Sequence, residues 1–173
     1  MSWSFDPAHS EVSFSVRHMM IARVRGSFPT WSGTVDADAD GTLLVLTVEI
    51  DTGSVNTREA QRDGHLASPD FFNSAEFPKM TFASSAIAPD QAGSFEISGT
   101  LTIKDVTRPV VLRATYNGTG KDPWGNTRRG YGAKTSINRT EFGLGWNAAL
   151  ELGGVLVGEA VDIELDVQIV QKA

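Results

Sequence analysis

The fold is decided by Val161-Asp162-Ile163-Glu164-Leu165-Asp166-Val167-Gln168-Ile169, close to the C-terminus, where apolar and polar residues alternate at every position. A period of two is typical of a β-strand with one buried and one solvent-facing side. Earlier stretches repeat the pattern, with these apolar members: Val12, Phe14 and Val16; Leu44, Leu46, Val48 and Ile50; Phe95, Ile97, Leu101 and Ile103; Val110, Leu112, Ala114 and Tyr116. The sequence therefore predicts a protein built mainly of β-strands.

Segments rich in Gly, Pro, Asn and Asp separate these stretches, and such segments predict hairpin turns. They are residues 38–41, 89–93, 117–120 and 122–126. About eight strands joined in this way favour an antiparallel barrel or sandwich, and a closed barrel leaves no exposed strand edge. We therefore predict an all-β fold, an antiparallel β-barrel.

Residues 54–73 interrupt the alternation and predict a short helical insertion. Asn56-Thr57-Arg58-Glu59 matches a capping box, in which Asn56 and Glu59 would bond to each other's backbone amides, so that a helix would run to about Leu66. Ser68-Pro69 predicts a second helical turn, with serine as the cap and proline at the first helical position. We interpret the insertion as a lid that closes one end of the barrel.

The composition describes an ordinary globular chain. Its 173 residues fit one domain, residues 1–173, and 40% hydrophobic with 21% charged residues argues against disorder. The 15 basic and 21 acidic residues give a net charge of -6, which repels nucleic acid and anionic membranes, and the sequence shows no basic patch that would override it. The absence of cysteine excludes disulfides, thiolate metal sites and cysteine nucleophiles.

The sequence contains no integral membrane segment, because no apolar stretch approaches the ~20 residues that span a bilayer. The N-terminus lacks a basic region followed by an apolar core, so no signal peptide is predicted and the expected location is cytoplasmic. A periplasmic location follows instead if a signal peptide has been removed from a mature chain.

Several motifs occur in the order known for one family. They are Trp3-Ser4-Phe5-Asp6-Pro7-Ala8-His9-Ser10-Glu11-Val12-Ser13-Phe14-Ser15-Val16-Arg17-His18-Met19, Val24-Arg25-Gly26-Ser27-Phe28, Arg62-Asp63-Gly64-His65-Leu66-Ala67-Ser68-Pro69-Asp70-Phe71-Phe72, Phe77-Pro78 with Thr81-Phe82, Gly99-Thr100-Leu101-Thr102-Ile103 with Thr107-Arg108-Pro109-Val110, and Ile137-Asn138-Arg139-Thr140-Glu141-Phe142-Gly143-Leu144. Together they resemble the YceI-like family. The resemblance implies an extended, lipocalin-like antiparallel barrel that binds a polyisoprenoid lipid or a similar long amphiphile in an apolar tunnel. It implies no further cofactor, and it allows a homodimer.

The predicted barrel interior has two interpretations. A barrel of about eight strands is either filled by its own side chains or holds one slender ligand. The alternation alone favours a packed core, whereas the family resemblance favours a tunnel for a polyisoprenoid or isoprenoid-quinone-like lipid. The inward apolar residues in either case are Phe14, Val16, Leu46, Val48, Ile50, Phe82, Phe142 and Trp146.

Polar residues around the insertion have two interpretations as well. Arg62, Asp63 and His65 form either a polar mouth that binds a head group or an ion pair and cap at the helix end. Asn138 and Arg139 either meet a ligand head or bond backbone in a tight corner. The remaining candidates are His18, which ends the first apolar face, Leu66 beside His65, and Phe71 and Phe72, which are either a gate or core anchors.

Catalysis and metal binding are not expected. Asp63 with His65 is the only near pairing that resembles acid–base machinery, and the sequence lacks the nucleophile and phosphate-loop motifs of common enzyme classes. Three histidines without a repeated ligand spacing do not predict a metal site. A hydrolase or isomerase that acts on an apolar substrate, and a protein-interaction barrel with a packed core, stay as alternatives to a lipid carrier.

Overall fold

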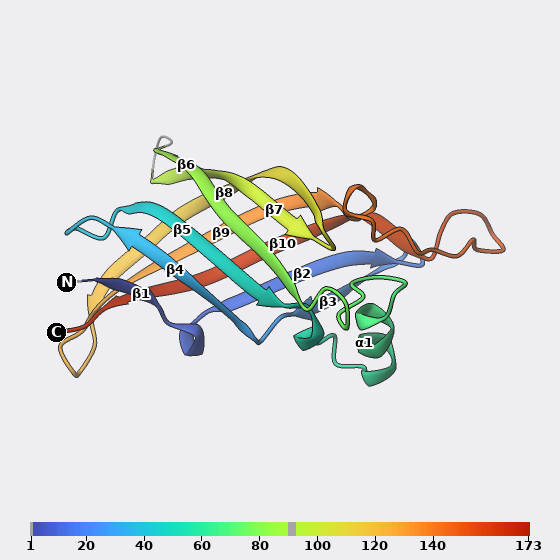
Figure 1. The fold of residues 1–173 in the computed structure, drawn as a ribbon, viewed down its shortest axis with the longest axis horizontal. Helices are drawn as coiled ribbons and strands as arrows, with labels where there is room; N and C mark the ends of the chain where they lie inside the picture. Colours follow the sequence, from blue (N-terminus) through green and yellow to red (C-terminus); the bar gives the residue numbers. More distant parts are fainter. Residues whose placement is uncertain (1, 90–92) are drawn as a thin grey trace.

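The computed structural model describes residues 2–89 and 93–173, and within them ten strands form one antiparallel sheet (Figure 1). The predicted all-β class is thereby confirmed. The strands are β1 (Trp3–Phe5), β2 (Glu11–His18), β3 (Ala22–Ser27), β4 (Trp31–Ala37), β5 (Leu43–Asp51), β6 (Lys79–Pro89), β7 (Ser94–Ile103), β8 (Val106–Lys121), β9 (Thr127–Asn138) and β10 (Val157–Gln171). Short 3-10 helices cover Pro7–His9, Thr52–Ser54 and Arg139–Phe142, and the α-helix α1 covers Ala60–Ala67.

The sheet curls into an extended barrel whose hydrogen-bonded ladder is incomplete. Its order is β3-β2-β10-β9-β8-β7-β6-β5-β4, and β1 pairs with the far half of β10. Side-chain packing brings β1 against β4: Phe5 meets Trp31 edge to face, with 5.5 Å between ring centroids. The short strands β1 and β3 bring the strand number above the eight or so expected from the sequence.

The alternation in β10 is confirmed, since Val161, Ile163, Leu165, Val167 and Ile169 all face the interior. In β5 the prediction fails at one position. Leu44 is exposed and Leu43 is buried in its place. The ladder between β4 and β5 shifts its register between Asp36 and Ala37, and such a bulge adds one residue to a strand, which reverses the side chain's direction.

Two of the predicted turns are confirmed. Residues 38–41 connect β4 to β5, with Gly41 at a φ of 86°, and residues 122–126 connect β8 to β9. The predicted turn at 117–120 is wrong, because these residues lie inside β8. These turn-like residues form a bulge next to Tyr116 instead, where Gly118 has a φ of 133°. Residues 90–92 of the turn predicted at 89–93 lie outside the described residues.

The helical insertion is present, but its predicted start is wrong. Arg58 has a φ of 64°, which is not helical, so the helix cannot begin at Asn56. Glu59 is the N-cap instead, and its carboxylate accepts from the Arg62 amide at 2.5 Å. Ser68 caps the C-terminal end, and non-helical turns replace the predicted second helical turn. α1 lies at one end of the curled sheet (Figure 1).

Candidate functional site

The curled sheet encloses a cavity of about 640 Å³. Every strand and α1 contribute to its lining, from Phe5 of β1 to Ile169 of β10. Most of the lining side chains are aliphatic or aromatic, because the period of two directs one apolar side chain inward at every second position. Ligand sites in proteins commonly have volumes of roughly 300–1,000 Å³ and mainly apolar walls. The interior is therefore a chamber and not a filled core.

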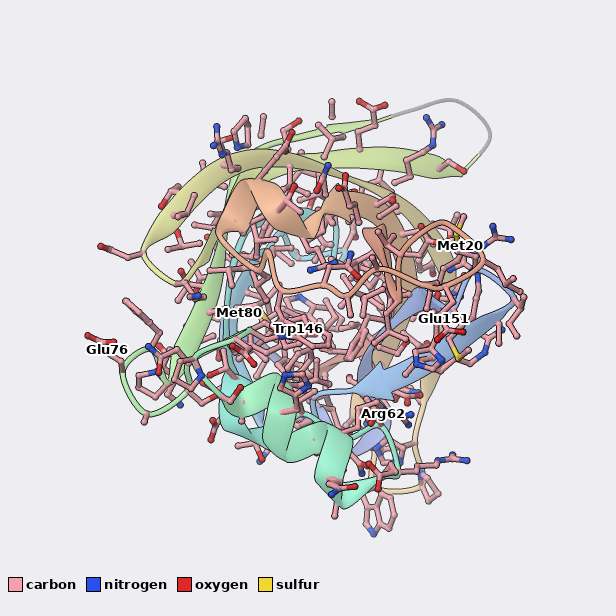
Figure 2. The ribbon with its side chains drawn as sticks, turned by 90° about the vertical axis from the view of Figure 1, so that its right-hand side faces the viewer. Met20, Arg62, Glu76, Met80, Trp146 and Glu151 are labelled. Atoms are coloured by element: carbon pink, nitrogen blue, oxygen red, sulfur yellow. The ribbon has the colours of Figure 1, made fainter. Side chains whose placement is uncertain are left out.

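The cavity opens at the end that carries α1. Of the described lining residues, three are exposed: Arg17 at the end of β2, and Glu59 and Gln61 at the start of α1. Figure 2 looks at this end, with Trp146 near the middle of the opening and Arg62 at its lower rim. The other lining residues are buried or half-buried, so this polar rim is the mouth of the cavity.

Aromatic side chains cover the opposite end, which we call the floor. The Tyr131 ring is buried, lies 6.0 Å from the Phe95 ring, and its hydroxyl donates to the Gly41 carbonyl at 2.8 Å. Arg129 donates to the Tyr131 hydroxyl at 3.0 Å and places its guanidinium 4.3 Å from the Tyr116 ring centroid. Burial raises the pKa of Tyr131, an effect that Arg129 partly offsets. No described lining residue is exposed at the floor.

A second aromatic group lies just inside the mouth. Ring centroids of His65 and Trp146 are 4.6 Å apart, those of His65 and Phe71 are 5.2 Å apart, and those of Phe71 and Trp146 are 5.7 Å apart. All three line the cavity. His65 Nε2 also lies 2.9 Å from the Asp70 carboxylate, which holds the imidazole in place. The insertion thus places His65 and Phe71 at the mouth, beside Trp146 from the loop between β9 and β10.

Asp63 does not belong to the mouth. Its carboxylate accepts from the Thr57 amide at 2.8 Å and from the Thr57 hydroxyl at 2.6 Å, and it does not line the cavity. Arg62 donates to the same hydroxyl at 2.7 Å and to the Thr57 carbonyl at 2.8 Å. Thr57 is only 4% exposed, so both residues brace a buried turn. The predicted pairing of Asp63 with His65 does not form, since each has another partner.

Arg139 is a corner brace on the cavity wall. The residue is 4% exposed, and its guanidinium donates to four backbone carbonyls: Leu144 at 2.5 Å, Gly158 at 2.7 Å, Trp146 at 3.0 Å and Val157 at 3.2 Å. Burial lowers the pKa of Arg139. These bonds fix the loop between β9 and β10 against the start of β10, which is the second of the two interpretations from sequence.

All candidate residues from the sequence line the cavity except Asp63, Asn138 and Phe142. Asn138 accepts from the Thr140 amide at 2.9 Å and hydroxyl at 2.6 Å, and Phe142 is 1% exposed in the core outside the cavity. The candidates that line the wall are Phe14, Val16, His18, Leu46, Val48, Ile50, Arg62, His65, Leu66, Phe71, Phe72, Phe82, Arg139 and Trp146. The candidate set missed wall residues such as Ile97, Leu101 and Leu112, although their alternation was visible.

Two substitutions test whether Asp63 stabilises the fold and whether His65 contacts the ligand. Asp63→Ala leaves the buried Thr57 amide and hydroxyl without their acceptor, so the free energy of unfolding in urea should fall by about 1–3 kcal/mol. Its affinity for a fluorescent apolar probe should stay unchanged. His65→Ala removes a ring from the mouth and should weaken that affinity with a smaller loss of stability. Asp36→Ala, at an exposed carboxylate on β4, is the control and should change stability by less than about 0.5 kcal/mol. Weaker probe binding by Asp63→Ala would show instead that Asp63 contributes to ligand binding at the mouth.

Neither a metal cluster nor a membrane-spanning helix is found in the described part of the chain. No group of three or more His, Asp or Glu side chains among residues 2–89 and 93–173 is placed to hold a metal ion. Within the same residues, no helix has the length and apolar character that a membrane span requires.

Comparison with known proteins identifies relatives over nearly the whole chain. A family model described as the YceI-like domain matches residues 3–169. A UPF0312 protein of Staphylococcus aureus (strain USA300) is 36% identical over 165 residues, which cover 94% of each chain. The crystal structure of the Campylobacter jejuni YceI protein superimposes with a TM-score of 0.79 at 28% identity, over 91% of this chain and 90% of that one.

A more distant structure shares the fold. It is the structure of a polyisoprenoid binding domain from Saccharophagus degradans, which superimposes with a TM-score of 0.68 at 15% identity over 98% of each chain. At this identity the similarity concerns the fold alone.

Proposed function

Since this chain belongs to the YceI-like domain family, we propose that it is a non-catalytic carrier that binds, stores or transports one long-chain polyisoprenoid or isoprenoid-quinone-like lipid. The observation that carries the proposal is the chamber of about 640 Å³ with an apolar wall and a polar mouth. The description of the Saccharophagus domain as polyisoprenoid binding supports this ligand class.

The wall favours an apolar tail of no particular shape. A buried methylene contributes about 0.8 kcal/mol gross, from which the cost of ordering a flexible chain is subtracted. A tail of many carbons therefore binds firmly without specific polar contacts. The mouth supports an amphiphile, because Arg17, His18 and His65 line the cavity where a polar head would stay near water.

The same geometry supports binding over catalysis. The acid–base pairing that the sequence suggested is divided, with Asp63 on Thr57 and His65 on Asp70. The charged lining residues are at the mouth or, like Arg139, bonded to backbone carbonyls. The apolar wall between mouth and floor suits the containment of a tail.

Extraction of the purified protein tests the proposal. Organic extraction of the protein expressed in a bacterial host, followed by mass spectrometry, should recover one class of long-chain isoprenoid lipid, close to one molecule per chain. Lipid extracted from the host's membranes under the same conditions is the control. Sedimentation of the same sample measures whether the carrier is a homodimer. A protein that yields no lipid, or only the membrane mixture, would contradict the proposed function.

A further inference from the structure

Two projecting tips at the mouth expose apolar side chains. The hairpin between β2 and β3 carries Met19, Met20 and Ile21, which are 43%, 52% and 83% exposed. The loop before β10 carries a fully exposed Leu152 and a Val155 that is 41% exposed. Single exposed apolar residues are common on protein surfaces, but a group of them at one place marks an interaction site.

The two tips form one continuous surface, which we call the apolar rim. Backbone pairing of His18 with Val157 and a 2.7 Å hydrogen bond from the Met19 amide to the Leu156 carbonyl join them. A Cβ atom built on Gly154 would overlap the Met20 sulfur, so the tips touch. Figure 2 shows Met20 and Glu151 on the same side of the opening.

The apolar rim adjoins the mouth. Arg17 and His18 precede the hairpin tip, Leu156 and Val157 follow the loop tip, and all four line the cavity. A lipid that leaves the chamber beside these residues therefore passes directly onto the rim.

Three arginines lie next to the apolar rim, in the strands that lead into and out of the hairpin. Residues 17–25 contain Arg17, Arg23 and Arg25 and no carboxylate, and all three arginines are exposed. Antiparallel pairing sets Arg17 beside Arg23, whose guanidinium contacts Asp162 at 2.9 Å. Glu151 and Glu159 are the nearby acidic residues in sequence around the loop. The expectation that the chain has no basic patch is therefore wrong for this hairpin, whose arginines form a local basic group in a chain of net charge -6.

We propose that the apolar rim docks on an anionic lipid bilayer. Ile21, Met20 and Leu152 enter the interfacial layer, and the arginines of the hairpin meet lipid phosphates. The cavity mouth then faces the membrane. A fluid lipid surface closes around projecting tips, whereas a stable protein partner needs an extended matching face of roughly 800 Å² on each side. The purpose of this docking rests on the proposed carrier function, and its test does not.

Vesicle sedimentation with the full chain tests the docking. The protein should sediment with vesicles of phosphatidylcholine and phosphatidylglycerol, and more weakly with phosphatidylcholine alone or at high salt. The double variant Ile21→Asp with Leu152→Asp should bind at least about tenfold more weakly. Glu151→Lys should bind more tightly, because it removes the carboxylate on the loop tip. The control is Trp124→Asp, which changes a 78% exposed side chain in the β8–β9 turn at the opposite end and should bind normally.

Three outcomes would overturn the docking. They are no sedimentation of the unaltered protein with anionic vesicles, equal loss in the double variant and in Trp124→Asp, and a double variant that loses self-association of the free protein with no effect on vesicles. The last outcome would assign the rim to contact between copies of the chain. Circular dichroism verifies the fold of each variant. Lipid extraction from the same preparations tests the carrier function separately from the docking. Vesicle binding can fail while the cavity still holds its lipid, and the cavity can be empty while the protein still binds vesicles.

Discussion

A Val48→Trp variant is expected to purify with at least about tenfold less bound lipid than the unaltered protein, and to melt at nearly the same temperature once lipid is removed from both. Val48 is half-buried in the middle of β5 and lines the cavity. A larger side chain there extends into open space. In a packed core the added volume would instead cause strain of about 1–3 kcal/mol.

The matched control is Val45→Trp on the same strand. Val45 is 45% exposed and points outward, because it alternates with the inward-facing Leu46 and Val48. This variant should keep its lipid and also the added thermal stability that bound ligand provides by mass action. Mass spectrometry of organic extracts and thermal unfolding measure both effects. If Val48→Trp melts far below the unaltered protein and the latter yields no lipid, the carrier proposal is wrong and the barrel is a packed scaffold.

Arg139→Ala is expected to lower the free energy of unfolding by about 3 kcal/mol, because it leaves buried carbonyls without donors. For a chain of this length, this corresponds to a fall of about 10 °C in Tm. The affected carbonyls are those of Leu144, Trp146, Val157 and Gly158, which the guanidinium holds together. The loop that carries Trp146 to the mouth would lose its anchor to β10.

Two further substitutions serve as controls for the loss of stability in Arg139→Ala. Arg139→Lys keeps the charge but lacks the planar fork, so it should recover only part of the stability. Arg25→Ala, at an exposed arginine of β3, should change the free energy of unfolding by less than about 0.5 kcal/mol. Urea unfolding measures all three variants. An Arg139→Ala protein of normal stability that no longer binds lipid would show that this arginine contacts the ligand head and is not a brace.

Most of the fold could be predicted from the alternation of residue types, because a barrel wall imposes the same period of two on every strand. The errors came from bulges. At Leu44 the shift depends on how β5 pairs with β4, and at residues 117–120 a bulge within β8 contains the residue types of a turn. A bulge is a property of two paired strands, so the sequence of one strand does not specify it.

The candidate site was predictable to the same extent. The apolar wall follows from the alternation, and Val48 and Phe82 line it as expected. The polar residues were harder, because the partner of Asp63 is Thr57, six positions away across a turn whose shape depends on the left-handed Arg58. The apolar rim depends on contact between two loops more than a hundred positions apart, Met20 and Gly154, which no local pattern indicates.

The aromatic floor also limits the length of the lipid tail that the chamber can hold. If the chain carries a lipid as proposed, a tail that enters at the mouth would advance until it meets the Tyr131 ring, and each further carbon taken in would slow its escape by about fourfold, at about 0.8 kcal/mol per carbon. Once the tail touches the floor, additional carbons stay outside and add nothing. The dwell time of a bound lipid should therefore rise steeply with chain length and then level off, so that the proposed carrier would select lipids by length whatever their head groups.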